Sequence, residues 1–320
     1  MIWSFYHSRM FRTCQRQWYL KTIMASATAN HPLRREAFLL SKLQSIAAWR
    51  GSLVDAIISD RMIPVRKDKP NPNPARIIED AREIFNKQLK FATQHRLRKP
   101  GMTLKEAGDA FAAFHAVEYE LAVTQAEIKQ AWTDVEQALT NLLQMRELWI
   151  LLSQAVSLIP QRPLTFPYYQ EIKVKAVPDL IAFFDNRPPL IVDWKVHTFG
   201  RQDARLQLAT YALALTHCKP HIDFPRVLSR YHATDIRLLE VQLLTKQQRE
   251  YTLSNDDIEE VENHIAQTAM EMVLATRNRS NGALSPFDFP TTAYPEHCQI
   301  CPFRSLCWLT NPELSGKESI

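Results

Sequence analysis

The chain has few glycines and no long apolar run. Only six of its 320 residues are glycine, and none forms a glycine-rich loop of the kind that cradles a nucleotide phosphate. No uninterrupted apolar stretch approaches the roughly 20 residues of a membrane span, so we expect no membrane insertion. The sequence also contains no internal repeat and no low-complexity segment, and its 46% hydrophobic residues suffice for a substantial core.

The first residues do not resemble an apolar secretory leader, because they are rich in cationic and aromatic side chains. We therefore expect a cytoplasmic protein, in a reducing compartment where clustered cysteines favour metal binding over disulfides. The net charge of +5 is compatible with binding to phosphate backbones without requiring it. Two basic segments, 61–69 and 95–99, could follow a DNA strand or could be solvated loop ends.

Four of the five cysteines are arranged as one candidate metal site. Cys298, Cys301 and Cys307 form a C-x2-C-x5-C pattern near the end of the chain, and Cys14 stands alone near its start. Two sulfurs spaced as C-x2-C can reach the same ion or cluster edge. The pattern therefore predicts a four-thiolate site for zinc or for an iron-sulphur cluster. Cys218 lies in a helical pattern, which indicates a packing role.

The middle of the chain has the pattern of three strands followed by a helix. Segments 168–174, 177–184 and 190–196 are rich in β-branched and aromatic residues, and turn-forming residues fill 185–189. We expect these segments to be consecutive strands of one meander. After Asp203 the apolar period changes from two to about 3.6, which predicts a helix.

Two carboxylates and a lysine fall on these expected strands. Asp193 and Lys195 are two residues apart, so both side chains lie on one face of a strand while Trp194 lies on the other. An antiparallel neighbouring strand would bring Asp179 beside Asp193. Two carboxylates can hold a hard divalent cation such as Mg²⁺. A nearby ammonium can stabilise the charge of a reacting phosphate or orient an attacking water.

Gln207 and Tyr211 are four residues apart and so share one face of the expected helix. Each of these polar residues has a simpler explanation when taken alone. Asp179 could belong to a turn, Asp193 and Lys195 to a solvated strand face, and Gln207 to a helix surface. Their arrangement over three successive elements favours a common site.

These motifs resemble those of the PD-(D/E)XK nuclease superfamily, in its RecB-like branch. The resemblance rests on Pro178-Asp179, Asp193-Trp194-Lys195 and the Q-x3-Y pattern from Gln207 to Tyr211. Within that branch, one cysteine near the N-terminus and a late C-x2-C-x5-C pattern are similar to the iron-sulphur nucleases, which include the AddB nuclease domain and CRISPR-associated exonucleases. The resemblance covers both ends of the chain and roughly residues 166–218.

The resemblance implies a role for each matching residue. Asp179 and Asp193 would be ligands of Mg²⁺ or Mn²⁺, with the Trp194 carbonyl as a possible third ligand. Lys195 would be the catalytic lysine, and Gln207 and Tyr211 would position the lysine or the DNA strand. The ligands of a 4Fe-4S cluster would be Cys14, Cys298, Cys301 and Cys307.

One position departs from the pattern of the RecB-like exonucleases. Their G-x3-H segment supplies a metal-binding histidine. In this chain the matching segment begins at Gly51, and Asp55 stands in place of the histidine. An aspartate can still bind Mg²⁺ or Mn²⁺ through oxygen, or Asp55 could be an exposed helix residue without a role. Glu171 matches an acidic position of some members, although a solvated strand carboxylate explains it as well.

The expected fold class is α/β, with a restriction-endonuclease-like core of mixed sheet flanked by helices, a large helical insertion, and a cysteine cluster that joins the two ends. The expected parts are N-terminal helices (1–60), a helical insertion (61–165), the nuclease core (166–280) and a cysteine segment with a tail (281–320). We also expect helices at 34–60, from Pro74 to about 98 and at 256–276 after a capping Ser254, and strands at 226–232 and 237–244.

The function expected from this pattern is metal-dependent hydrolysis of single-stranded DNA or DNA ends. We expect exonuclease activity in preference to endonuclease activity. It would serve DNA repair and recombination, or CRISPR and phage defence. Three alternatives remain open at this point: a DNA-binding module that has lost cleavage, a zinc protein, and a subunit active only beside a helicase or a defence complex. The sequence shows no helicase motif.

Overall fold

The computed structural model describes residues 1–64, 73–97, 104–169, 172–196, 204–225, 231–276 and 284–309. The chain divides into two compact units. The first contains Met1–Phe5, Arg50–Phe85 and Ile128–Gln267, and the second contains Tyr6–Trp49, Asn86–Glu127 and Thr268–Ile320. The division of the sequence into four successive parts stays a prediction.

A five-stranded sheet forms the centre of the first unit, in the order β2-β5-β6-β7-β8. Pairing is antiparallel except between β6 and β7, which run parallel and are joined through a helix, as a parallel pair requires. The central strands are buried on both faces. The strands are β2 (Ser157–Pro160), β5 (Leu180–Phe184), β6 (Arg187–Lys195), β7 (Arg237–Gln242) and β8 (Gln247–Tyr251).

The hairpin between β5 and β6 is tighter than the sequence suggested. The turn is reduced to Asp185 and Asn186, and Asn186 has a φ of 55°, a conformation that asparagine tolerates well. Pro188 and Pro189, which we expected in the turn, belong to β6. They fall where the register with β5 shifts between Ala182 and Phe184, because proline in a sheet is tolerated at such irregularities.

A second, three-stranded sheet has the order β1-β4-β3. The expected meander of three consecutive strands is wrong at this point, because β4 pairs with β1 and β3 and not with β5. β4 alternates buried and exposed residues, whereas β5 is buried throughout. The pattern of β4 therefore suits a sheet with one exposed face, and that of β5 suits a sheet covered on both faces. The strands are β1 (Ile2–Trp3), β3 (Leu164–Pro167) and β4 (Lys173–Ala176).

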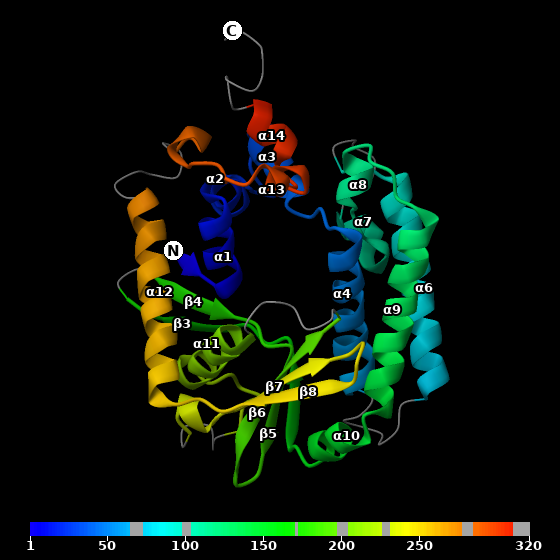
Figure 1. Cartoon of the computed structure of the whole chain (residues 1–320), viewed down its shortest axis with the longest axis vertical. Coiled ribbons are helices and arrows are strands. Elements are labelled where there is room, and N and C mark those ends of the chain that lie inside the picture. The colour runs from blue at the N-terminus through cyan, green and yellow to red at the C-terminus, as the bar shows by residue number, and fades with distance from the viewer. Residues whose placement is uncertain are drawn as a thin grey trace. The chain divides into compact units, whose positions relative to one another are not determined.

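Helix α11 (Ala204–His217) contacts strands of both sheets, β3, β4, β6 and β7 (Figure 1). It is apolar almost all round and largely buried, as expected of a helix packed between layers. Helix α12 (Asn255–Thr276) confirms the expected helix. Ser254 caps it, since its Oγ accepts from the N–H of Asp257 at 3.2 Å.

Three of the remaining helices, α4, α6 and α9, belong to both units, because a boundary between the units falls within each of them. Helix α6 begins at Pro74, as expected. Trp132 and Trp149 are buried in the core, and the indole of Trp149 donates to Leu142 O at 2.7 Å. The helices are α4 (Ile46–Ile57), the π-helix Ile58–Met62, α6 (Pro74–Gln94), α9 (Gln125–Gln144) and α10 (Arg146–Ser153).

Besides its parts of α4, α6, α9 and α12, the second unit contains short helices around an aromatic core. Phe289 and Phe303 are fully buried, and the ring of Tyr19 stacks on Phe289 with centroids 4.6 Å apart. The elements are α1 (Phe5–Thr13), α2 (Gln15–Tyr19), the π-helix Leu20–Met24, α3 (Pro32–Leu40), α7 (Leu104–Ala107), α8 (His115–Glu118), α13 (Pro295–Gln299) and α14 (Arg304–Leu309), with 3₁₀ turns at Gly108–Ala110 and Pro286–Asp288.

Some expectations lie partly or wholly outside the described residues: the role of Glu171, most of the strand at 226–232, and parts of the basic segments 61–69 and 95–99. The expected strand at 237–244 is confirmed as β7. No described helix is both long enough and apolar enough to cross a membrane.

Candidate active site and cysteine cluster

Two carboxylates meet where β5 begins and β6 ends. Asp179 directly precedes β5, and the pairing of Leu180 with Val192 places it beside the last residues of β6. The Oδ2 of Asp179 accepts from the backbone N–H of Trp194 at 2.8 Å. Asp193 is 1% exposed. The antiparallel placement of Asp179 beside Asp193 is therefore as the sequence predicted.

Lys195 forms an ion pair with Asp193. Its Nζ lies 2.5 Å from Asp193 Oδ2, and its side chain is 18% exposed. The indole of Trp194, between them in the chain, is buried. The alternation along β6 thus puts Asp193 and Lys195 on one face.

Helix α11 adds Gln207 and Tyr211 to the same group. Lys195 Nζ donates to Gln207 Oε1 at 3.4 Å, and Gln207 Nε2 donates to the hydroxyl of Tyr211 at 2.6 Å. Tyr211 is 8% exposed. The i, i+4 spacing of Gln207 and Tyr211 therefore allows a chain of hydrogen bonds from Tyr211 through Gln207 to Lys195.

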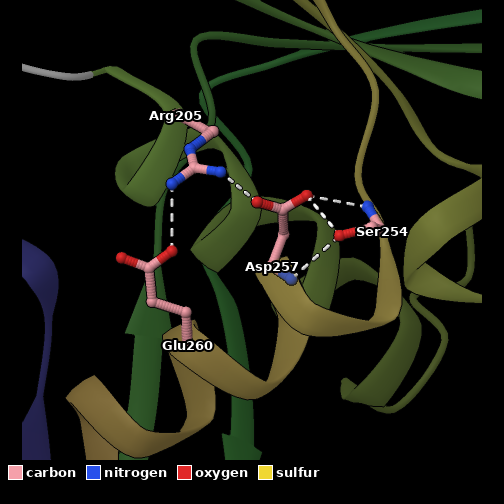
Figure 2. Close-up of polar contacts among 4 residues, drawn as sticks. All are labelled: Arg205, Ser254, Asp257 and Glu260. Atoms are coloured by element: carbon pink, nitrogen blue, oxygen red, sulfur yellow. Dashed lines mark hydrogen bonds and ion pairs between the residues drawn. The ribbon is translucent and has the colours of Figure 1, made fainter.

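An ion-pair network fixes the first turn of α11. Figure 2 shows Arg205 between two carboxylates of α12: its Nη1 pairs with Asp257 Oδ1, and its Nη2 lies 3.0 Å from Glu260 Oε2. Asp257 in turn accepts from the N–H and the hydroxyl of Ser254, each at 2.8 Å (Figure 2). These contacts hold the turn that carries Gln207.

Asp55 reaches the group from α4. Burial, followed by repulsion from Asp193, raises the pKa of Asp55 to about 7, and the Lys195 ammonium opposes the shift. The helix is held here by Arg50, which pairs with Asp134 and donates from Nη2 to Val196 O at 2.7 Å. The charges of Asp193 and Lys195 therefore both act on Asp55.

The charges of the group shift one another. Burial and then repulsion from Asp193 and Asp55 raise the pKa of Asp179 well above its usual range. Burial and the same strand carboxylates raise the pKa of Tyr211. Burial lowers the pKa of Lys195, but the charges of Asp193, Asp179 and Glu240 together outweigh it and raise the pKa. Acidic side chains are therefore concentrated around one ammonium.

The donor set suits a hard divalent cation. Among the described residues, no three His, Cys, Asp or Glu side chains are gathered closely enough to hold an ion by themselves. Mg²⁺, however, is commonly held by one or two carboxylates, with waters and substrate phosphates completing its shell. Asp179 and Asp193 provide such a pair, and their mutual repulsion is the kind that a cation relieves.

Sequence reasoning missed the polar residues that β7 and β8 add to this face. Glu240 and Gln242 are almost fully buried and pair in register with Asp193 and Lys195. Their polar side chains in an otherwise apolar strand, LLEVQLL, were the available signal. Nothing in the sequence alone linked Arg50 to β6.

The four cysteines expected to form one site line one small cavity of the second unit: Cys14, Cys298, Cys301 and Cys307. Cys14 precedes α2, Cys298 lies on α13, and Cys307 lies on α14. Cys218 belongs to the first unit, where it is buried and its Sγ faces Leu215 O at 3.5 Å. Its expected packing role agrees with this place.

Packing brings the late segment of the chain to Cys14. Arg16 donates from its backbone N–H to Pro290 O at 3.1 Å and from Nε to Phe289 O at 3.1 Å. The hydroxyl of Tyr19 donates to Leu284 O at 2.8 Å. Residues of α2 thus bind the backbone that leads into the other three cysteines.

Several donors point at these sulfurs. The N–H of Gln17 lies 3.4 Å from Cys14 Sγ, and Nη1 of Arg16 lies 3.9 Å from Cys307 Sγ. Burial raises the pKa of the Cys301 thiol to about 12, although a backbone hydrogen bond from Phe303 opposes the shift. Burial also raises the pKa of Cys298, to which the charge of Cys14 adds, and the pKa of Cys307, where Arg16 opposes the shift. Metal binding would release protons from these thiols.

Comparison with known proteins places this geometry in a family. The sequence model of the PD-(D/E)XK nuclease superfamily matches residues 2–308, while no curated protein matches the chain.

Two solved structures resemble it at low identity. A "Putative exonuclease" from Eubacterium rectale is 14% identical, with a TM-score of 0.38 over 99% of this chain and 92% of its own. The protein SSO0001 is 13% identical, with a TM-score of 0.29 over 62% and 80%. The family match confirms the expected restriction-endonuclease-like fold class, and the chain belongs to the PD-(D/E)XK nuclease superfamily.

Proposed function

We propose that this chain is a Mg²⁺- or Mn²⁺-dependent deoxyribonuclease that hydrolyses single-stranded DNA or DNA ends. The observation that carries the proposal is the meeting of Asp179, Asp193 and Lys195 where two adjacent strands begin and end, with Lys195 Nζ 2.5 Å from Asp193 Oδ2. Two carboxylates and one ammonium are the groups that phosphodiester hydrolysis with a bound cation needs.

Asp179 and Asp193 would hold the cation, with Asp55 and the Trp194 carbonyl as further oxygen ligands. When bound, the ion supplies Lewis-acid stabilisation of the scissile phosphate and lowers the pKa of an attacking water. Lys195, whose raised pKa keeps it cationic, would stabilise the negative charge that develops on the phosphate oxygens.

Gln207 and Tyr211 would orient the lysine. The hydrogen bonds that connect Tyr211, Gln207 and Lys195 support this role. A long lysine side chain loses rotamer freedom when it is held in this way, and this preorganisation is needed before reaction.

In the second unit, we propose a structural 4Fe-4S cluster held by Cys14, Cys298, Cys301 and Cys307, as in the iron-sulphur RecB-like nucleases that the sequence resembles. The shared cavity and the donors near the sulfurs support it, since hydrogen bonds to sulfur are typical of such sites. Four thiolates would leave no ligand position open to substrate.

Action on ends or single strands favours an exonuclease over an endonuclease. The proposal also includes a partner that unwinds duplex DNA, either a helicase of repair and recombination or a CRISPR or phage-defence complex, because the chain has no helicase motif. This part rests on the resemblance alone.

An assay with end-labelled strands tests the proposal. Anaerobically purified protein is mixed with 5′- or 3′-labelled single-stranded DNA, duplex DNA or RNA, with Mg²⁺, Mn²⁺ or EDTA. We expect metal-dependent shortening of single-stranded DNA that Asp193→Asn abolishes. Binding without cleavage by the intact protein under every metal condition would instead identify a DNA-binding module that has lost catalysis.

A further inference from the structure

The polar face of the active-site sheet continues from β6 onto β7. In the parallel pairing of these strands, Asp193 is opposite Glu240 and Lys195 is opposite Gln242. Paired residues of neighbouring strands project to the same face. Glu240 is 5% exposed and Gln242 is fully buried, so a second pair of polar side chains lies beside the catalytic pair.

The amide of Gln242 has a fixed orientation. Its Nε2 donates to Glu240 Oε1 at 2.7 Å, and the hydroxyl of Tyr251 on β8 donates to Glu240 Oε2 at 2.7 Å. A carboxylate only accepts, so the NH₂ group of Gln242 has to face Glu240. The amide oxygen of Gln242 therefore has to point elsewhere.

That oxygen has no hydrogen-bond partner within the described part of the chain. A buried carbonyl oxygen without a donor is destabilising, because its lost hydrogen bonds to water are not replaced. The cationic donor opposite Gln242 in the pairing of β6 and β7 is Lys195, whose ammonium now contacts Asp193 and Gln207.

A cation bound at Asp193 would compete with this ion pair. The bound ion and the ammonium repel each other, so Lys195 needs another acceptor if it is to remain in the site and not turn into solvent. We propose that Gln242 is a positioning residue, whose Oε1 accepts Lys195 Nζ when a divalent cation binds Asp193, and that Glu240 and Tyr251 hold the amide in place for this exchange. The inference rests on the proposed function of the site.

A double-mutant cycle on Mn²⁺ affinity, measured by electron paramagnetic resonance without DNA, tests this inference. The variants are Gln242→Met, Lys195→Met and their combination, and Gln248→Met, an exposed residue of β8, is the matched control. We expect Gln242→Met to weaken Mn²⁺ binding about tenfold when Lys195 is present and to leave it unchanged when Lys195 is absent, as for directly coupled neighbours.

Each other outcome has a definite meaning. Equal weakening in both backgrounds would assign Gln242 a purely structural role and overturn the inference, as would no weakening in either. If Gln242→Met fails to fold, Tyr251→Phe replaces it in the same cycle, with a smaller expected loss of affinity that again requires Lys195. Mn²⁺ binding that Asp193→Asn leaves unchanged would instead overturn the proposed function, and this inference with it.

Discussion

Nζ of Lys195 lies 2.5 Å from Oδ2 of Asp193, the carboxylate whose charge raises the pKa of both Asp55 and Asp179 in the described site. The pair has two consequences. First, the positive charge of Lys195 offsets the repulsion of Asp55 and Asp179 by Asp193. Second, a bound cation would neutralise the same carboxylates, so that Lys195 could interact with the phosphate.

The first prediction concerns stability without metal. In EDTA at pH 8, Lys195→Met should lower the free energy of unfolding by about 3 kcal/mol, because it leaves buried carboxylates without their cation. Asp193→Asn should cost less, since it also removes repulsion. Urea unfolding measures both. A greater loss for Asp193→Asn would contradict this account, and both variants should reduce cleavage at least ~100-fold.

The second prediction concerns pH. The pKa of Asp55 is raised to about 7 in the folded protein, so the folded state binds more protons than the unfolded state between pH ~4 and 7. The stability from this group is present below pH ~4 and is lost as the pH rises through 7. In EDTA, melting temperatures should therefore fall over that range, and Asp55→Asn should flatten the decline. Asp60→Asn, an exposed control, should leave the slope unchanged.

The third prediction exchanges a ligand type. Asp55→His introduces an imidazole, which suits softer transition metals better than Mg²⁺. If Asp55 is a ligand, the ratio of cleavage rates in Mn²⁺ and Mg²⁺ should rise several-fold. Initial rates with each metal measure this ratio. An unchanged ratio with an unchanged rate would place Asp55 outside the metal site.

Much of the active-site face could be predicted from local spacing. The i, i+2 relation of Asp193 and Lys195 and the i, i+4 relation of Gln207 and Tyr211 follow from strand and helix geometry alone. The position of β4 could not be predicted, because local sequence indicates a strand but not its partners.

Contacts between segments far apart in the chain could not be predicted from the sequence either. Glu240 joins the site through the parallel register of β6 and β7, which a crossover helix sets and no local pattern reveals. Arg205 reaches Asp257 and Glu260 some fifty residues later, and such pairs depend on how helices pack.

The fourth prediction concerns this arginine network. Arg205→Met should loosen the first turn of α11 and lower stability by about 1 kcal/mol, because the contacts are partly exposed. Cleavage should fall less than for Lys195→Met, since Arg205 acts through the placement of Gln207. Arg205→Lys should restore only part of both, because one ammonium cannot span two carboxylates as a guanidinium does. Urea unfolding and single-turnover rates measure the two effects, and full activity in Arg205→Met would exclude a positioning role.

The last prediction concerns the cysteine site. Protein purified without oxygen should be brown, with broad visible absorption and about four irons per chain, as expected of a 4Fe-4S cluster. Cys14→Ser should remove the colour and increase protease sensitivity, because metal binding is coupled to folding and Cys14 closes a loop of nearly the whole chain. Arg16→Met should keep the iron but bleach faster in air, since it loses the donor near Cys307 Sγ.

Cys218→Ala is the matched control, since Cys218 is outside the cavity that the other cysteines line. It should keep full colour and iron content, with a modest loss of stability from the small cavity that it creates. A colourless protein with one zinc per chain would replace the cluster by a zinc site, because the same four thiolates suit zinc. Full metal content and unchanged melting in Cys14→Ser would instead show that the ends of the chain are not joined through this cysteine.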